Sequence, residues 1–425
     1  MELTRLNLFT QPAGAAGKSG SHELNEGRGP RRPAIVHLIT VPVSLRFLTG
    51  QLDFVRRCGF DIHVISSPGE ELVRFGSAEG AFLHEVPMSR SITPLRDLVA
   101  LFRIWRLLRR IQPVLVDAHT PKAGLLGMIA AWLERVPARI YHMHGLPFLT
   151  RTGFIHRLLR GSEWVSSLLS TEVLCESPSN REVAIAERVC PADKIKVLLG
   201  GSANGIDTNR FRPDSGKQRE KVRGRLGIPA DAFVIGFVGR IVREKGVSEL
   251  VTAWRVLASE FPRVHLLVIG PFEPQDPVPE DTAKSLCSEP QIHLVGLDWE
   301  TPPWFSAMDV LALPSYREGL GTVSLEAASM GLPVVATRVP GCTDAVVDGV
   351  TGTLVPPRDA NAVADALRLY LTQPELRRAH GSAGRGRIIQ DFRQEAIWSA
   401  MANEYRELLT TRGVPWPGDL SVAEG

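Results

Sequence analysis

The chain has 425 residues, a net charge of +3 and 44% hydrophobic residues, which predicts a globular protein too long for one ordinary core. Residues 1–212 carry 27 Lys/Arg and 19 Asp/Glu, whereas residues 213–425 carry 22 and 27, so the two halves differ in sign. The basic half either faces an anionic partner or is a solvated surface without one. Five scattered cysteines without a CxxC pair predict a reducing compartment, and no apolar stretch reaches the roughly 18 residues of a membrane span.

Residues 1–33 are rich in Gly, Pro, Ser and Arg, and they predict a disordered N-terminal extension. From Ala34 onward, short apolar runs alternate with amphipathic segments, which predicts a parallel sheet covered on both faces. The expected strands are 34–40, 61–67, 82–87, 115–120, 138–145 and 171–177, and the expected helices are 94–111, 121–134, 153–168 and 179–188.

A second series follows the charged stretch 217–227. Its expected strands are 232–239, 265–270, 291–296, 309–315 and 333–339, with helices that start near 246, 281, 301, 322 and 342. We therefore expect an α/β protein with two doubly wound Rossmann-like domains, 34–215 and 216–391, facing a cleft. A Gly/Arg-rich break at 381–387 precedes a C-terminal helix at 392–412, which could return to the first domain, and a tail at 413–425.

Two cations follow the first strand of the second series. Arg240 and Lys245 lie just past the strand's carboxyl end in FVGRIVREKG, where they could grip a diphosphate. Taken alone, they could equally be loop charges paired with Glu244.

Two carboxylates flank an expected helix start in PSYREGLGTVSLEA. Glu318 lies in the loop, and Glu326 lies on the first turn, where it could accept hydrogen bonds from a ribose hydroxyl pair. The free amides of the helix start favour a diphosphate, and the residues predicted to bind it are Gly319, Leu320, Gly321 and Thr322. The alternative is an early acid that only complements the helix dipole.

With these motifs, residues 34–412 resemble a family-4 retaining glycosyltransferase of the GT-B fold. Segments 202–211 and 331–359 also match that family, and 114–148 is most similar to its bacterial capsule, exopolysaccharide and lipopolysaccharide branch. The resemblance implies that Arg240 and Lys245 neutralise the leaving diphosphate and that Glu326 holds the ribose. It also implies that Glu318 contacts the donor sugar.

The first domain supplies further candidates at its strand ends. The resemblance places His144, followed by the Gly145 turn, beside the donor sugar and phosphate, so Glu318 and His144 are the predicted catalytic residues. His119, next to Lys122, is either a cleft residue or a hydrogen-bonded structural histidine. Gly50 stands where these enzymes place a glycine-rich donor loop, but the segment VPVSLRFLTGQ lacks paired glycines.

The expected helix at 94–113 carries Arg103, Arg106, Arg109 and Arg110 beside large apolar residues. It is either an interfacial helix on anionic lipid or an ordinary amphipathic helix with arginines in water. With Arg151, Arg157 and Arg160, these residues favour a lipid-linked or other anionic glycan acceptor, and a cytoplasmic protein peripheral on the inner face of the plasma membrane. No nucleic-acid motif accompanies them, so nucleic acid is not an expected partner.

No Asp-x-Asp motif is present to hold a cation on the diphosphate, so the sequence predicts a transfer without metal or other cofactor. By resemblance, the reaction is front-face transfer from a nucleoside diphosphate sugar, most frequently a UDP-sugar, to an acceptor hydroxyl. Two rival functions are a catalytically silent sugar-nucleotide-binding scaffold and a nucleotide-sugar epimerase of the same architecture.

Overall fold

The computed structural model describes residues 32–417. Most of the predicted 1–33 extension and the end of the 413–425 tail lie outside that range. Within it, the five cysteines are free, and no helix combines the length and the apolarity needed to cross a bilayer.

The first domain is built on a seven-stranded parallel sheet in the order β3-β2-β1-β4-β5-β6-β7. Its strands are β1 (Ala34–Leu38), β2 (Asp61–Ser66), β3 (Phe82–Glu85), β4 (Leu115–His119), β5 (Ala138–Met143), β6 (Glu172–Cys175) and β7 (Ile195–Lys196). Its helices are η1 (Pro42–Leu48), α1 (Gln51–Arg57), α2 (Glu70–Glu79), α3 (Pro94–Ile111), α4 (Pro121–Leu133), η2 (Pro147–Thr150), α5 (Gly153–Leu169) and α6 (Pro178–Ala186).

The second domain is built on a six-stranded parallel sheet in the order β10-β9-β8-β11-β12-β13. Its strands are β8 (Phe233–Val238), β9 (Val264–Ile269), β10 (Ile292–Gly296), β11 (Val310–Leu313), β12 (Val334–Thr337) and β13 (Gly352–Val355). Its helices are α7 (Lys217–Leu226), η3 (Arg243–Lys245), α8 (Val247–Glu260), α9 (Glu280–Ser288), α10 (Pro302–Ala307), α11 (Thr322–Ser329), α12 (Cys342–Ala345), α13 (Ala360–Thr372) and α14 (Pro374–Asp391).

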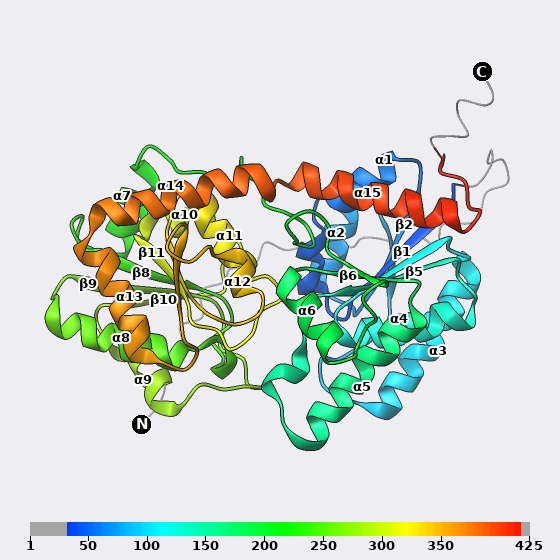
Figure 1. Ribbon diagram of the computed structural model, residues 1–425, viewed down its shortest axis with the longest axis horizontal. Helices are drawn as coiled ribbons and strands as arrows, with labels where there is room; N and C mark the ends of the chain where they lie inside the picture. Colours follow the sequence, from blue (N-terminus) through cyan, green and yellow to red (C-terminus); the bar gives the residue numbers. More distant parts are fainter. Residues whose placement is uncertain (1–31, 418–425) are drawn as a thin grey trace, which may run out of the picture. The chain divides into compact units, whose positions relative to one another are not determined.

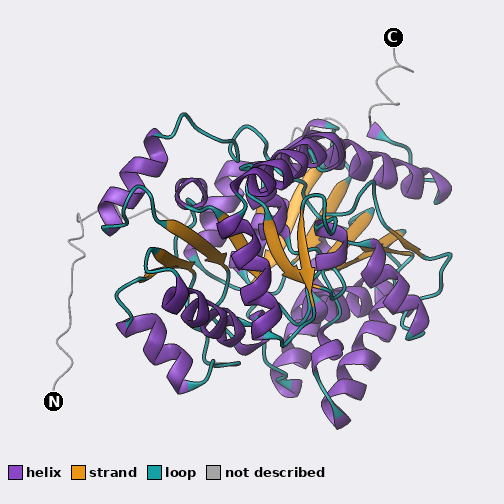
Figure 2. Cartoon of the chain, turned by 60° about the vertical axis from the view of Figure 1, so that its left-hand side comes forward, coloured by secondary structure: helices purple, strands orange, loops and turns teal. Residues whose placement is uncertain are grey.

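Helices cover both faces of each sheet (Figure 2). In the first domain, α3, α4 and α5 pack side by side over one face, and α1 and α2 cover the other. The nearly continuous apolar strands are buried because both faces are covered; β1, β4 and β6 are almost fully buried along their length. The predicted doubly wound α/β architecture with two parallel sheets is confirmed.

The last helix, α15 (Gln394–Thr411), packs on the first domain although it follows α14 of the second (red, Figure 1). Met401, Tyr405 and Leu409 are buried in the same apolar core as Ile35 of β1 and Leu52 of α1. The predicted return of the C-terminal helix to the first domain is confirmed.

The predicted break at 381–387 is wrong, because α14 runs through it without interruption. Its glycines are packing positions: a Cβ on Gly381 would lie 2.0 Å from the carbonyl oxygen of Gly331, and one on Gly384 would lie 3.3 Å from Ala328 of α11. Small residues therefore let α14 approach α11 and the segment after it. The chain bends at Phe392 and Arg393 instead, between α14 and α15.

Candidate donor-binding site

The second sheet positions the predicted donor site at its topological switch point. Its chain order reverses between the neighbouring strands β8 and β11, and ligands of open α/β sheets bind at the carboxyl ends of such strands. Arg240 and Lys245 follow β8, and Glu318 follows β11. The fold therefore gathers residues that are about 75 positions apart in the sequence.

Glu318 is held by two contacts at this point. Its Oε1 lies 2.5 Å from the ammonium Nζ of Lys245 and accepts a hydrogen bond of 2.7 Å from the Ser315 hydroxyl. The exposed fractions of the two charged side chains are 17% for Lys245 and 11% for Glu318, so the pair is sheltered from water. Partial burial strengthens the attraction between the two charges, and both side chains keep a small exposed area.

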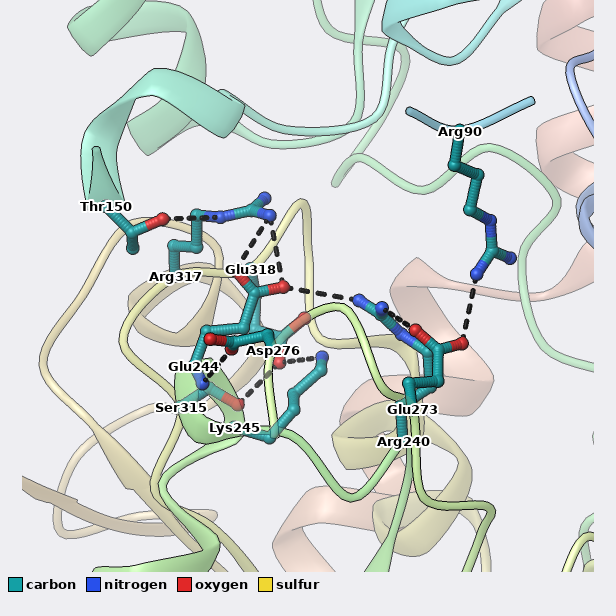
Figure 3. Close-up of polar contacts among 10 residues, drawn as sticks. All are labelled: Arg90, Thr150, Arg240, Glu244, Lys245, Glu273, Asp276, Ser315, Arg317 and Glu318. Carbon is teal, nitrogen blue, oxygen red and sulfur yellow. Dashed lines mark hydrogen bonds and ion pairs between the residues drawn. The ribbon is translucent and has the colours of Figure 1, made fainter. Parts of the chain in front are cut away.

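Arg240 is bound to two acids of its own domain. Its guanidinium donates to Oε2 of Glu273 at 2.7 Å and to Oε1 of Glu244 at 3.3 Å. Arg90 of the first domain reaches the other oxygen of Glu273 at 3.0 Å (Figure 3). The pairing of Arg240 with Glu244 that the sequence offered as an alternative is therefore present, within a larger group of charges that both domains share.

Arg317 makes a second bridge between the domains. Its Nη2 donates to both oxygens of Glu244, at 3.1 and 3.0 Å, and its Nε donates to the Thr150 hydroxyl of η2 at 3.3 Å (Figure 3). Arg317 was not among the residues predicted from the sequence, although it directly precedes Glu318. Three arginines and Lys245 therefore alternate with Glu244, Glu273 and Glu318 in a cluster of ion pairs at this end of the second sheet.

Helix α11 begins where expected, at Thr322, with Gly321 as its cap at a φ of +67°. Glu326 lies half-buried on its second turn, not its first. Burial raises the pKa of the Glu326 carboxyl to about 7, and the charges of Arg46 and Arg210 partly oppose that shift. A half-buried carboxyl of this kind gains from hydroxyl groups that donate to it.

The loop that carries Glu318 is pinned by the first domain. The side-chain amide of Asn180 on α6 donates to the carbonyl oxygens of Glu318 and Gly319 at 2.9 and 2.8 Å. The Ser177 hydroxyl donates to the same Gly319 oxygen at 2.7 Å. Gly319 also lies so close to the first domain that a Cβ would come within 2.4 Å of Glu176 Oε2 and 2.6 Å of the His144 carbonyl oxygen.

His144 therefore lies at the junction of the two domains, as expected from its place after β5. Its Nδ1 is 2.6 Å from Oε1 of Glu176, and its ring stacks on Phe47 of η1 with 5.3 Å between centroids. Burial alone would raise the pKa of Glu176, but His144 outweighs it, so that pKa lies below its ordinary value. Gly145 faces Gly319, where a Cβ would lie 3.2 Å from its backbone.

The other first-domain candidates occupy different places. His119 is fully buried, and its Nδ1 lies 3.0 Å from Nε2 of His144, so it stands behind that residue. The Lys122 side chain does not contribute to the site beside His119, because its ammonium pairs with Asp97 of α3 at 2.7 Å. Gly50 begins α1, where its amide donates to Glu79 at 2.7 Å and a Cβ would collide with Trp398 of α15.

Two arginines near Glu326 were not predicted from the sequence either. The guanidinium of Arg46, on η1, lies 4.2 Å over the ring of Trp299, and Arg210 donates to the Trp299 carbonyl oxygen at 3.0 Å. Arg46 belongs to the segment VPVSLRFLTGQ, which lacks the paired glycines of related enzymes. This segment therefore brings the guanidinium of Arg46 to the site.

Two groups of described residues have atoms close enough to be considered for a metal: His119, His142 and His144, and His37, Asp117 and His119. Hydrogen bonds among the histidines engage several of the same nitrogen atoms. A separate hollow of about 680 Å³ lies between β7 and α15, and none of its lining residues belongs to the donor site.

Two Rossmann-like domains, with cations, a helix start and carboxylates at a switch point, form the architecture of the GT-B class of glycosyltransferases. The sequence pattern of "Glycosyltransferase Family 4" matches residues 50–210, and that of "Glycosyl transferases group 1" matches residues 218–387. The chain is 35% identical over 375 residues to the capsular polysaccharide biosynthesis glycosyltransferase CapM of Staphylococcus aureus, covering 88% of this chain and 97% of that protein. The protein belongs to the group 1, family 4 glycosyltransferases.

Two further similarities agree. An Escherichia coli enzyme named UDP-Gal:alpha-D-GlcNAc-diphosphoundecaprenol alpha-1,3-galactosyltransferase is 25% identical, over 78% of this chain and 85% of that one. The solved structure of Anabaena HepE in complex with UDP and glucose superposes with a TM-score of 0.72 at 21% identity, over 87% of this chain and 98% of that one. The latter likeness concerns the fold.

Proposed function

We propose that the protein transfers a sugar from a UDP-sugar to a hydroxyl of a lipid-linked glycan, with retention at the anomeric carbon and without a metal. The reaction would belong to bacterial surface polysaccharide synthesis. The observation that carries the proposal is the pairing of Lys245 with Glu318 at the switch point of the second sheet, on a loop whose next residue, Gly319, lies against His144 of the first domain. The second domain thus offers phosphate-binding cations close to His144, which follows β5 of the first domain.

The donor assignment has two supports. Lys245, Arg240 and the start of α11 offer positive charge to a diphosphate. The solved Anabaena structure was determined with UDP and glucose, and the name of the Escherichia coli relative contains UDP-Gal.

The reaction follows from those charges. As the bond from the anomeric carbon to the diphosphate breaks, negative charge grows on the leaving phosphate, and Lys245 and Arg240 stabilise it in place of a metal. The acceptor hydroxyl adds to the anomeric carbon on the face that the phosphate leaves, and its proton passes to a phosphate oxygen. Glu318 and His144 orient and polarise the sugar.

The diphosphate must compete with Glu318 for Lys245, because the ammonium is already paired in the unliganded protein. Donor binding would therefore release the Glu318 carboxylate toward the sugar. Binding of the donor and positioning of the Glu318 carboxylate would therefore occur together.

The lipid-linked acceptor is supported by the surface of the first domain. Large apolar side chains are exposed on two helices: Leu95 (81%) and Leu98 (62%) in the first turns of α3, Phe102 (57%) near its middle, and Phe154 (74%) at the beginning of α5. Both helices run antiparallel to the strands, so their first turns lie at the carboxyl edge of the sheet. Exposed arginines on both helices would attract anionic headgroups, and we therefore infer that the protein docks on the cytoplasmic face of a membrane.

Vesicle binding tests this surface. The double variant Leu98→Glu/Phe102→Glu should lose most of its sedimentation with phosphatidylglycerol vesicles. A matched control is Val73→Glu, a residue 55% exposed on α2, on the opposite face of the sheet. Equal sedimentation of the double variant and the control would contradict membrane docking through α3.

The function itself is tested by thermal-shift screening of the purified protein against a panel of nucleotide sugars, followed by product analysis with a polyprenyl-linked acceptor in EDTA. We expect a raised melting temperature with a UDP-sugar, release of UDP, and a product that keeps the donor's anomeric configuration. Binding without turnover would favour a silent scaffold. Conversion of the nucleotide sugar without UDP release would favour an epimerase.

A further inference from the structure

A row of buried histidines lies behind the donor site. His37 of β1, His119 of β4 and His142 of β5 have exposed fractions of 0, 0 and 2%. Three contacts form a chain: His37 Nδ1 to His119 Nε2 at 3.4 Å, His119 Nδ1 to His144 Nε2 at 3.0 Å, and His144 Nδ1 to Glu176 Oε1 at 2.6 Å. The row therefore ends at the residue that faces the Glu318 loop.

A buried carboxylate stands beside this row. Oδ1 of Asp117 lies 3.4 Å from Nε2 of His119 and 3.9 Å from Nδ1 of His142, and it has no hydrogen-bond partner among the described residues. Its other oxygen, Oδ2, accepts a hydrogen bond of 2.6 Å from the Tyr405 hydroxyl. Tyr405 is fully buried and belongs to α15, so the C-terminal helix holds the carboxylate that faces the histidines.

We propose that Asp117 and Tyr405 are positioning residues for glycosyl transfer, which act through His119 on the orientation and proton arrangement of His144. The proposal rests on the proposed role of His144 beside the donor sugar. It assigns to α15 a part in the chemistry besides its packing on the first domain.

The proton arrangement follows from the distances. Because the Glu176 carboxylate accepts from Nδ1 of His144, that nitrogen carries a proton. The remaining nitrogen of His144 then either accepts from His119 Nδ1 or donates to it. When it donates, the proton of His119 is on Nε2, directed at Asp117 Oδ1.

A carboxylate opposite Nε2 of His119 favours this second arrangement, in which both ring nitrogens of His144 are held by hydrogen bonds. A ring held at both nitrogens keeps one orientation beside the leaving phosphate, so no reorganisation is needed as the bond breaks. The Tyr405 hydroxyl fixes the carboxylate in the position that this requires. The ionisable groups in this row or beside it are His37, His119 and His142, with Asp117, Glu176 and Tyr405 next to them.

Tyr405→Phe is the leading test, because it removes one oxygen and keeps the ring. We expect kcat to fall about tenfold, with the donor KM unchanged within twofold. Tyr370→Phe is the matched control: Tyr370 is equally buried and its hydroxyl lies 2.8 Å from Nδ1 of His380, far from the donor site. Equal kcat values for the two variants, after correction for folded fraction, would overturn the proposal.

Asp117→Asn is the second variant, with kcat and the donor KM measured separately on the folded fraction. It should lower kcat by about 10- to 100-fold and leave the donor KM within twofold of the wild-type value, because His119 and His144 lose the carboxylate that orients them while the donor-binding residues are unchanged. A simple loss of stability would lower the active fraction, and kcat corrected for that fraction would equal the wild-type value. Should this variant not fold, Tyr405→Phe decides alone.

Two further measurements separate the possible failures. If His144→Gln turns over like the wild type, the proposed role of His144 fails. If His144→Gln is inactive while both positioning variants are normal, only this inference fails. Stoichiometric zinc in the purified protein would also overturn it, because the metal would take the nitrogen atoms that form the row.

Discussion

Oε1 of Glu318 lies 2.5 Å from the ammonium of Lys245, so the acid predicted to face the donor sugar is paired with a cation predicted to hold the diphosphate. Glu318 lies on the loop that follows β11, Lys245 ends the short helix η3 that follows β8, and Asn180 of the first domain holds the backbone of the Glu318 loop. The pair is therefore fixed by both domains before any ligand arrives.

Lys245→Met should reduce kcat/KM by about 100- to 1000-fold, because the leaving phosphate loses a sheltered cation. The measurement is UDP release at several donor concentrations. Lys284→Met, an exposed lysine on α9, serves as the control for loss of a positive charge. Activity of Lys245→Met within threefold of the control would contradict the proposed role.

Gly319→Ala should reduce activity at least tenfold, because its Cβ would lie 2.4 Å from Glu176 Oε2 and must push the domains apart or move the Glu318 loop. Turnover and melting temperature are measured together. Gly224→Ala is the control: Gly224 lies in α7 with no atom within 4 Å of an added Cβ, and the change should stabilise the protein by about 0.5–1 kcal/mol. An active Gly319→Ala variant would show that the close approach is not needed.

Glu326→Gln tests the raised pKa of this acid. Because its folded pKa is about 7 and its ordinary value 4.5, the folded protein holds a proton between those pH values that the unfolded chain releases. Its contribution to the free energy of unfolding therefore falls as pH rises from 4.5 to 7. The melting temperature of Glu326→Gln should accordingly rise relative to wild type between pH 5 and pH 8.

Glu163→Gln provides the matched comparison. Burial also raises the pKa of Glu163 to about 7, but this acid bonds the Tyr141 hydroxyl in the first domain. Both variants should show the same trend in melting temperature, whereas only Glu326→Gln should weaken UDP binding, by about tenfold or more. Equal UDP affinities would remove Glu326 from the ribose site.

The sequence predicted both sheets because buried parallel strands are continuous apolar runs, such as Val234 to Phe237 in β8. It did not reveal β7, which has only two residues, or the role of Gly381, which is decided by the backbone of Gly331. The motif residues Lys245 and Glu318 were found because each follows a strand. Asp117 and Tyr405 were missed because 288 residues separate them and neither belongs to a local pattern.

Glu318→Ala provides the most direct test of the central claim that Glu318 acts on the sugar while the cations and α11 hold the nucleotide. UDP affinity by calorimetry and sugar transfer by product analysis are measured on the same preparation. We predict that transfer is lost while the Kd for UDP stays within a few-fold of the wild-type value. Turnover equal to that of the wild type would contradict the account.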